Sequence, residues 1–196
     1  MRKSKVHRET TETNVTVELN LDAPGDAPAP IHTPIPFLNH MLDLASKHGH
    51  FTLKIDATGD TDVDYHHLME DIGITLGEAI SKALGDKSGI ERYGSASVPM
   101  DESLAEVVID LSGRPYLVYN VKDNSGYLKD LQVSLFEDFF RGLSSHGLFN
   151  LHILLHYGRD THHIYEAIFK AFGRALSTAA ALNPKTKGVP STKGTL

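Results

Sequence analysis

The sequence contains no cysteine, and this absence excludes several classes of chemistry at once. Disulfide bonds, thiolate metal ligands and a thiol nucleophile are all ruled out. A chain without cysteine fits a reducing compartment, and we expect a cytoplasmic protein. No run of about 18 apolar residues is present, so the sequence predicts no membrane span. The basic residues 1–5 lead into polar residues rather than an apolar segment, which is not typical of a secretory signal.

Positive charge is also in short supply. Lysine and arginine number 19 against 25 acidic residues, a formal net charge of −6. We therefore expect no binding of nucleic acid by the chain as a whole, although a local anion pocket is compatible with this balance. With 196 residues and 40% hydrophobic side chains, the chain can form one domain or two small halves around a real core. Histidine is abundant, with 12 residues and no six-histidine tag.

One short pattern occurs twice, as His-His-Leu-Met-Glu at residues 66–70 and His-His-Ile-Tyr-Glu at residues 162–166. Each copy opens a stretch of helical periodicity, and residues three or four apart share one face of a helix. Adjacent histidines point about 100° apart and can serve two different points. A single copy would most often be a solvated helix start. Two copies indicate one or two sites for a divalent ion of the Mn, Fe, Co, Ni or Zn type.

An internal repeat connects the two copies. Residues 37–55 align without a gap with residues 135–153 and share the pattern Ser-x-His-Gly-x-Phe-x-Leu-x-Ile. Two copies are too few for a solenoid. We predict an α+β fold of two tandem pseudo-symmetric repeats, residues 1–96 and 97–196, which together form one catalytic domain. We expect the two halves to pack against each other with pseudo-twofold symmetry.

The periodicity of apolar residues assigns most of the chain to elements. Strands are predicted at residues 12–21, 50–57, 105–111, 116–121 and 148–156. Helices are predicted at residues 37–47, 66–84, 131–145 and 162–182. Loops are predicted at residues 22–36, with at most a short extended piece near Ile31, and at residues 122–130.

The repeat nominates further metal ligands, because His40 and Asp138 hold matching places on the helix before each His-His helix. His40 alone would more often be an ordinary helix histidine, but beside Asn39 and with the repeat the two readings are about equal. Asp138 is the weaker candidate, and His146, the counterpart of His48, is an alternative to it. An oxygen ligand such as Asp138 binds the same metals as histidine does.

Other candidates are cationic or acidic. Arginine and lysine beside small hydroxyl residues form phosphate or carboxylate pockets, although each alone is more often a surface cation. Glu12, near the first strand, is a candidate general acid/base, although the residues alone favour a strand-edge charge. Glu102 holds the matching place in the second half. Residues 59–64 form an acidic turn without the pattern of a calcium loop. The candidate anion-binding residues are Arg92, Arg114, Ser191, Thr192 and Lys193.

The chain resembles the imidazoleglycerol-phosphate dehydratases of histidine biosynthesis over nearly its whole length. The matching blocks are residues 8–13, 37–48, 59–64, 66–73, 92–94, 99–102, 110–115, 162–172 and 190–194. The resemblance implies elimination of water from D-erythro-imidazole-glycerol phosphate to give imidazoleacetol phosphate. It implies that each repeat is a small mixed β-sheet with two helices packed on one face. It also implies a homo-oligomer of 24 subunits built from trimers, with active sites shared between subunits.

The resemblance further implies two Mn²⁺ ions per active site. One ion is bound by His40, His67, His162 and Glu166. The other is bound by His66, Glu70 and His163, with a fourth ligand at the place of Asp138, where family members carry histidine or an acid. Catalytic roles fall on Glu12, Glu166 and His40. Contacts to the small phosphate substrate fall on Glu12, His40, His48, Arg92, Arg114, Ser191, Thr192 and Lys193.

Two other functions fit parts of the pattern. A metal-storage or structural-metal protein would use the His-His helices without turnover, but it would have no need of the arginines and lysines that suit a phosphate. A dinuclear phosphoester hydrolase would rely mostly on bridging aspartates rather than on histidine. The dehydratase therefore accounts for more of the sequence than either alternative.

Overall fold

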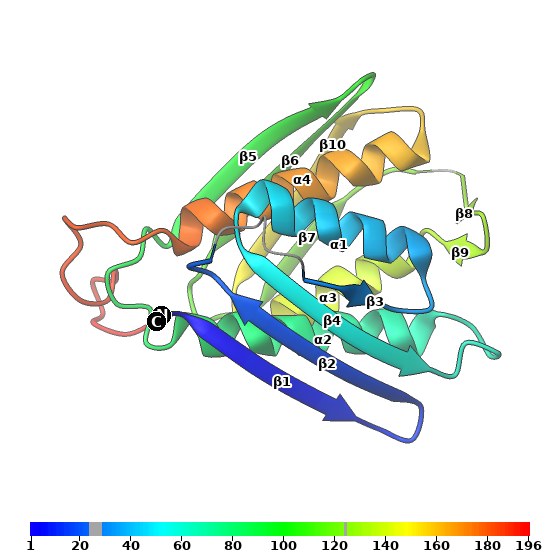
Figure 1. The fold of residues 1–196 in the computed structure, drawn as a ribbon. Helices are drawn as coiled ribbons and strands as arrows, with labels where there is room; N and C mark the ends of the chain where they lie inside the picture. Colours follow the sequence, from blue (N-terminus) through cyan, green and yellow to red (C-terminus); the bar gives the residue numbers. More distant parts are fainter. Residues whose placement is uncertain (24–28, 124) are drawn as a thin grey trace.

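Two four-stranded mixed β-sheets form the outer layers of the molecule, and the helices lie between them (Figure 1). The structure is a computed structural model that describes residues 1–23, 29–123 and 125–196. The first sheet has the order β1 (Lys3–Glu9), β2 (Thr13–Asn20), β4 (Thr52–Gly59) and β3 (Ile31–His32). The second has the order β5 (Tyr93–Met100), β6 (Ser103–Asp110), β10 (Asn150–Tyr157) and β7 (Tyr116–Asn120).

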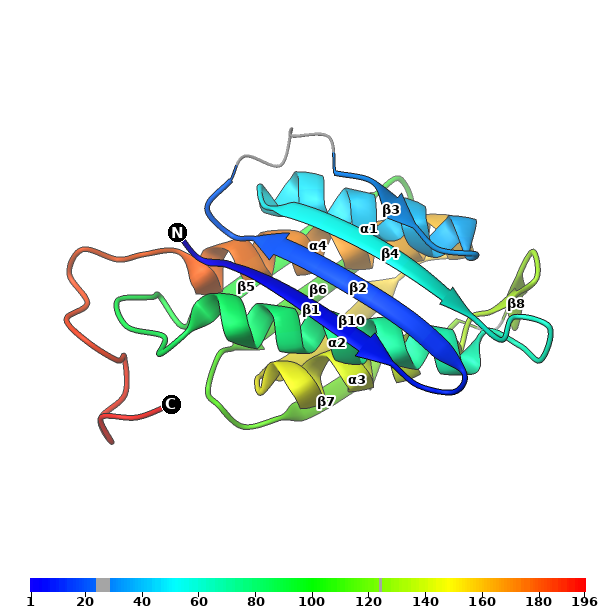
Figure 2. The same cartoon turned by 60° about the horizontal axis from the view of Figure 1, so that its bottom comes forward.

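The four helices of the described residues form two packed pairs (Figure 2). They are α1 (Pro36–Gly49), α2 (His66–Leu84), α3 (Leu135–Gly147) and α4 (Thr161–Ala180). In the first repeat α1 lies beside β3 and β4, while α2 packs on β1 and β2. In the second repeat α3 lies beside β7, and α4 packs on β5 and β6. Across the repeats, α1 packs on α4 and α2 packs on α3.

The alternation in sequence explains why each sheet has one buried face. In β2, Val15, Val17 and Leu19 are buried against the helices, while the residues between them point outward. In β10, Leu151 and Ile153 are buried in the same way. In each sheet the first three strands, in the order given above, pair antiparallel. The fourth strand pairs parallel with the third. The α+β fold of two mixed sheets with two helices each is therefore confirmed.

The shared pattern of the repeat forms the same helix end twice. Residues 50 and 148, which follow α1 and α3, both adopt the left-handed conformation with φ of 54°. The next residues, Phe51 and Phe149, each donate a backbone hydrogen bond of 3.3 Å to the serine carbonyl of the pattern. A side chain at Gly49 or Gly147 would collide with the phenylalanine ring that follows it. The two glycines are thus required by a close ring contact.

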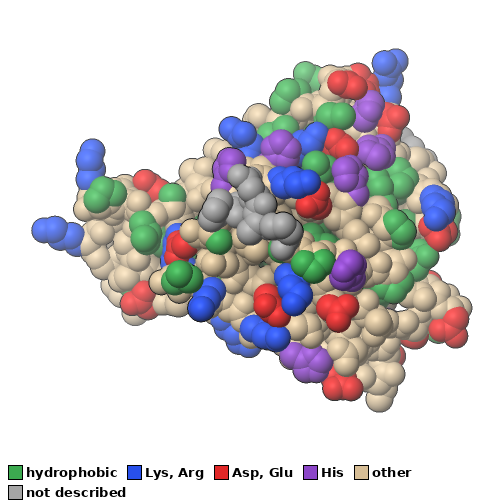
Figure 3. All heavy atoms as spheres, in the orientation of Figure 1, with side chains coloured by type: hydrophobic (Ala, Val, Ile, Leu, Met, Phe, Trp, Pro, Cys, Tyr) green, Lys and Arg blue, Asp and Glu red, His purple; other side chains and the backbone are tan. Residues whose placement is uncertain are grey.

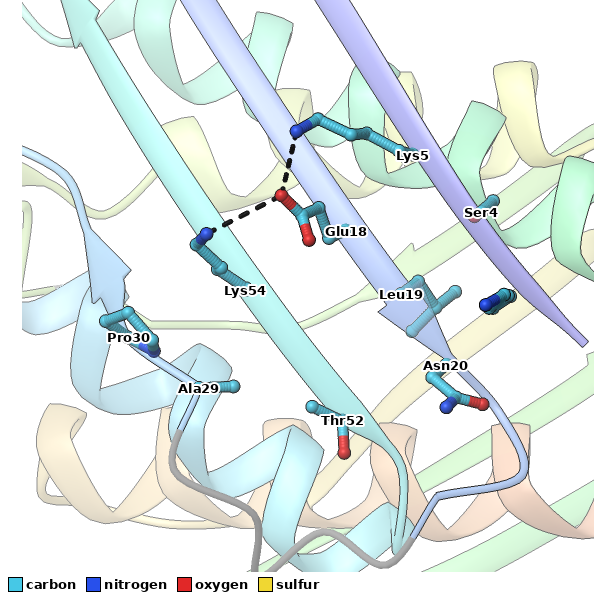
Figure 4. A pocket seen from close by; sticks show the side chains of 10 residues that line it. Ser4, Lys5, Glu18, Leu19, Asn20, Ala29, Pro30, Thr52 and Lys54 are labelled. Atoms are coloured by element: carbon cyan, nitrogen blue, oxygen red, sulfur yellow. Dashed lines mark ion pairs between the residues drawn. The ribbon is translucent and has the colours of Figure 1, made fainter.

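An open hollow lies on the outer face of the first sheet, between β1, β2 and β4 (Figure 4). There Glu18 forms ion pairs with Lys5 at 3.0 Å and with Lys54 at 3.5 Å. None of the residues predicted for the functional site lines this hollow. Among the described residues, no helix is long and apolar enough to cross a membrane.

Several predicted elements differ from the structure. The strands β1 and β5 were not predicted. The helix predicted from residue 131 begins only at Leu135, because residues 131–132 form strand β9, which pairs with β8 (Tyr127–Leu128). The polar loop predicted at residues 122–130 was therefore wrong where it covers β8. The division after residue 96 falls inside β5 and stays a prediction.

Candidate active site

A compact cluster joins the N-terminal halves of α1 and α4. Nε2 of His40 lies 2.9 Å from Oε1 of Glu166, and Nε2 of His162 lies 3.1 Å from the same oxygen. Among the described residues, these are the group of three whose donor atoms all lie within 4.8 Å of one another. The two histidine side chains are 45% and 46% exposed, whereas that of Glu166 is 10% exposed. The imidazoles therefore border solvent above a buried carboxylate.

Glu166 is held in its charged form by its neighbours. Burial alone would raise its pKa, but hydrogen bonds from Lys170, His40 and His162 lower it to about 2. Nζ of Lys170 lies 2.6 Å from Oε2, so that Oε1 alone faces the two histidines. Lys170 was not singled out from the sequence, although it stands four residues after Glu166, a spacing typical of helical ion pairs.

A second, looser cluster occupies the pseudo-symmetric place at the start of α2 and α3. Nδ1 of His66 lies 3.7 Å from Oδ2 of Asp138. Glu70 follows one turn later on α2 and is exposed. These three residues are the repeat counterparts of His162, His40 and Glu166. The structure thus places Asp138 beside His66, and its role as a metal ligand stays a prediction.

The remaining histidines of the doubled pattern engage other carboxylates. Nδ1 of His67 lies 2.9 Å from Asp60, and Nδ1 of His163 lies 2.8 Å from Glu102. These hydrogen bonds raise the pKa of both histidines. Neither histidine belongs to the three-residue cluster in the part of the chain that the structure describes. From the sequence, Glu102 was identified only as the counterpart of Glu12, and Asp60 only as part of an acidic turn, with no role for either.

The predicted anion-binding residues gather at the opposite end of the molecule. Arg92 bonds Asp110 through Nε at 2.7 Å and Nη2 at 3.2 Å, and its Nη1 donates to the carbonyl of Pro190 at 3.0 Å. Ser191 and Lys193 follow Pro190 in the C-terminal tail. The backbone N–H of Lys193 donates to the Ser191 hydroxyl at 3.2 Å. Hydrogen bonding to Asp110 raises the pKa of Arg92. The tail is therefore attached to the second sheet through Arg92.

This end is distant from the clustered histidines within one chain. The backbone N–H of Arg92 bonds the carbonyl of Ala179 at the end of α4. His162 stands 17 residues earlier on the same helix, or about 26 Å at 1.5 Å per residue. Arg114 is exposed on the loop after β6. Figure 1 shows the tail and the starts of the helices at opposite ends, and Figure 3 shows histidines gathered over the region of α1 and α4.

His48 and Glu12 lie apart from both groups. His48 is half-buried near the end of α1, where burial and then the charges of Lys170 and Arg174 lower its pKa. Glu12 lies in the turn between β1 and β2, and its side chain is 51% exposed. Its Oε2 is 3.8 Å from Nδ1 of His67, beyond hydrogen-bond distance. Each is therefore accessible from the surface.

The donor set of the three-residue cluster fits a divalent first-row metal ion. Two imidazole nitrogens converge on one ionised carboxylate oxygen, and the chain offers no sulfur ligand. Imidazole with carboxylate is a ligand set that suits Mn²⁺ and its neighbours in the series. Residues 40, 162 and 166 therefore form a possible metal site.

Comparison with known proteins agrees with this chemistry. The family model described as imidazoleglycerol-phosphate dehydratase matches residues 33–176. The chain is 54% identical over 196 residues to the imidazoleglycerol-phosphate dehydratase of Thermodesulfovibrio yellowstonii, with 100% of both chains covered. It is 51% identical to that of Bacillus pumilus over the same length and coverage. The chain belongs to the imidazoleglycerol-phosphate dehydratase family.

Solved structures of imidazoleglycerol-phosphate dehydratases share the fold. The enzyme from Staphylococcus aureus superposes with a TM-score of 0.81 at 39% identity, covering 92% of this chain and 98% of that one. The enzyme from Pyrococcus furiosus, in complex with (S)-C348, gives a TM-score of 0.81 at 37% identity, covering 97% and 100%. The resemblance stated from sequence motifs is thus confirmed. As an imidazoleglycerol-phosphate dehydratase, the chain is a hydro-lyase of histidine biosynthesis.

Proposed function

We propose that the chain removes water from D-erythro-imidazole-glycerol phosphate to give imidazoleacetol phosphate, with two Mn²⁺ ions in each active site. The observation that carries the number two is the pair of pseudo-symmetric clusters. His40, His162 and Glu166 form one, and His66 with Asp138 forms the other, with Glu70 one turn away. An imidazole substrate also offers two ring nitrogens, one for each ion.

The ligand sets follow the repeat. His67 completes the set of His40, His162 and Glu166, and His163 completes that of His66, Glu70 and Asp138. The choice of Asp138 over His146 is supported by position. Asp138 lies 3.7 Å from His66, whereas His146 follows eight residues later on α3, about 12 Å along the axis.

The ions, when bound, would supply Lewis-acid stabilisation of negative charge on the imidazole of the substrate. The chain supplies the remaining functions. Glu166 would stay ionised, because its pKa is lowered to about 2, and its hydrogen bond would hold the imidazole of His40 in its orientation. Glu12, exposed on its hairpin turn, would move protons at the side chain of the substrate, where a carbon-bound hydrogen and a hydroxyl are lost.

The phosphate would be bound at the other end of a subunit. Arginine and lysine match phosphate oxygens through charge-assisted hydrogen bonds. Because the distance along α4 is about 26 Å, one chain cannot bring this group to its own metal ligands. The separation supports active sites shared between subunits of a homo-oligomer, which we propose to be a 24-mer built from trimers. The proposed phosphate ligands are Arg92, Arg114 and Lys193, and the further proposed substrate contacts are His48, Ser191 and Thr192.

Turnover with defined metal content tests the proposed function. Protein stripped with EDTA and reloaded with Mn²⁺ should convert imidazoleglycerol phosphate to a product with the base-labile absorbance of an enol, and the stripped protein should not. Tight Mn²⁺ binding without product would instead support metal storage. Placement in the cytoplasm stays a prediction from the lack of cysteine.

A further inference from the structure

His67 and His163 hold equivalent places in the two repeats and use the same ring nitrogen. Each directs Nδ1 to a carboxylate, His67 to Asp60 at 2.9 Å and His163 to Glu102 at 2.8 Å. A carboxylate that accepts the proton of Nδ1 fixes the tautomer whose Nε2 carries the free lone pair. Both histidines are thereby prepared to bind a metal ion through Nε2.

The two carboxylates come from different places in the repeats. Glu102 lies in the hairpin turn between β5 and β6, and its repeat counterpart is Glu12, in the turn between β1 and β2. Glu12 is not used in the same way, because its Oε2 is 3.8 Å from Nδ1 of His67. In the first repeat the bond is made by Asp60, the residue that directly follows β4.

The second repeat has no room for a residue like Asp60. Gly158 directly follows β10 and is its counterpart. A Cβ atom at Gly158 would lie 2.6 Å from the Ser103 hydroxyl and 2.7 Å from the Ile164 side chain. The hairpin glutamate is therefore the carboxylate that hydrogen-bonds Nδ1 of His163, while Asp101 of the same hairpin lies 3.8 Å from Nε2, beyond hydrogen-bond distance.

Glu102 is itself held in a single orientation. Its Oε1 accepts backbone hydrogen bonds from Asp160 at 2.9 Å and from Arg159 at 3.2 Å, which leaves Oε2 for His163. Asp60 is held less firmly. Its Oδ2 bonds His67, and its Oδ1 is buried without a hydrogen-bond partner among the described residues.

We propose that Asp60 and Glu102 are positioning residues that orient His67 and His163 as metal ligands, and that Asp60 thereby frees the hairpin glutamate Glu12 to act on the substrate. This inference rests on the proposed function. It assigns different roles to two glutamates that the repeat makes equivalent. Each positioning residue serves one of the two ions, because His67 and His163 belong to different ligand sets.

Three single variants of the full chain, Glu102→Gln, Asp60→Ala and Glu12→Gln, test this division. In Glu102→Gln the amide oxygen stays on the backbone N–H groups of residues 159 and 160. The amide NH₂ then faces Nδ1 of His163, which moves the ring proton to Nε2 and blocks the metal-binding nitrogen. In Asp60→Ala the one hydrogen bond that orients His67 is lost.

Calorimetric titration of the EDTA-stripped proteins with Mn²⁺ gives the readout. Glu102→Gln and Asp60→Ala should each weaken one of two Mn²⁺ ions per chain by about 10–100-fold, the usual effect of losing such a partner. Glu12→Gln, the matched control, should bind both ions as the wild type does and lose turnover. Thermal unfolding in EDTA separates positioning from folding, because a purely structural role would lower the melting temperature of the metal-free protein.

The proposal is overturned if Glu12→Gln weakens Mn²⁺ binding as much as Glu102→Gln, or if neither positioning variant weakens it. If Glu102→Gln is unstable in EDTA, Asp60→Ala decides, since among the described residues the side chain of Asp60 bonds His67 and no backbone group. Failure of the proposed function looks different. In that case the wild type itself would fail to bind two ions or to form product.

Discussion

At the scale of single residues, histidine takes several roles in this chain according to what surrounds it. His40 and His162 face a buried carboxylate, whereas His67 and His163 are oriented by carboxylates from neighbouring turns. His48 has cationic neighbours instead. Its repeat counterpart His146 is exposed and bonds a backbone carbonyl of its own helix at 3.2 Å. The two members of this last pair therefore stand in different surroundings.

We predict that His48 makes the stability of the protein depend on pH. Burial and the charges of Lys170 and Arg174 lower its pKa below the ordinary 6.5, so the unfolded chain binds the proton more tightly. The contribution of His48 is full above pH 6.5 and is lost as the pH falls through its lowered pKa. Urea unfolding of metal-free protein across this range should show a flatter profile for His48→Gln than for the wild type.

His146→Gln serves as the matched control for this measurement, because it removes the equivalent histidine from an exposed place. It should leave the pH profile of stability as it is in the wild type. Equal flattening by both variants would show that burial and the cations near His48 do not set its titration.

At the scale of elements, helices of one repeat pack closely on helices of the other at glycine residues. A Cβ atom at Gly77 in α2 would collide with the backbone carbonyl of Leu143 in α3. A Cβ atom at Gly173 in α4 would collide with that of Ala45 in α1. The contacts are related by the repeat, and they fix how closely each helix pair approaches. That approach places His40 beside His162 and Asp138 beside His66.

Gly173→Ala should destabilise the protein, by about 1–3 kcal/mol for overpacking, even though alanine favours helix. The neighbour is backbone and cannot rotate away, so α1 and α4 must separate. Denaturant unfolding of the metal-free protein measures the loss, and Gly77→Ala should behave similarly. Thr178→Ala, exposed on the same helix, should stay within about 0.5 kcal/mol. A Gly173→Ala protein as stable as this control would contradict the close contact.

At the scale of the whole molecule, metal binding and phosphate binding are proposed at opposite ends of the helices. Candidate metal ligands lie at the helix starts, and the candidate phosphate group lies with the tail near Arg92. His67 and His163 are oriented from their own subunit, yet they remain outside the cluster of His40, His162 and Glu166. Neighbouring subunits, one bringing its His67 and another its Arg92, would complete the two halves of the proposed site, because these two residues lie at opposite ends of one chain.

Mixed oligomers test this sharing of sites. His40→Ala and His67→Ala subunits should each be inactive alone, because each disrupts the same ion. Co-expressed in equal amounts, they should regain activity in about a quarter of the sites, where one subunit supplies an intact His40 and the other an intact His67. Steady-state turnover of the purified mixture measures the recovery.

The control mixture combines His40→Ala with His162→Ala. Both residues belong to one chain's cluster, so no arrangement of these subunits restores an intact site. Recovery in this mixture, or none in the first, would count against active sites shared in the proposed way.

Sequence alone determined the features that depend on periodicity and residue type. Apolar alternation identified β2, β4, β6 and β10, and the repeat related His40 to Asp138. The start of α2 at His66 was also predicted, because the helical pattern begins directly after the acidic turn. These features could be predicted because each is written in a short stretch of chain. The motifs then identified the family and, with it, the reaction.

Only the tertiary structure decided which partner each side chain meets. The strands β1 and β5 carry weak patterns, since β1 buries only Val6 and β5 contains Gly94 and Pro99. They form because neighbouring strands complete their hydrogen bonds. Likewise, nothing local distinguishes Glu12 from Glu102. Their roles differ because Gly158 leaves no space where Asp60 stands in the other repeat, and such a difference in space arises only when the distant strands and helices pack together.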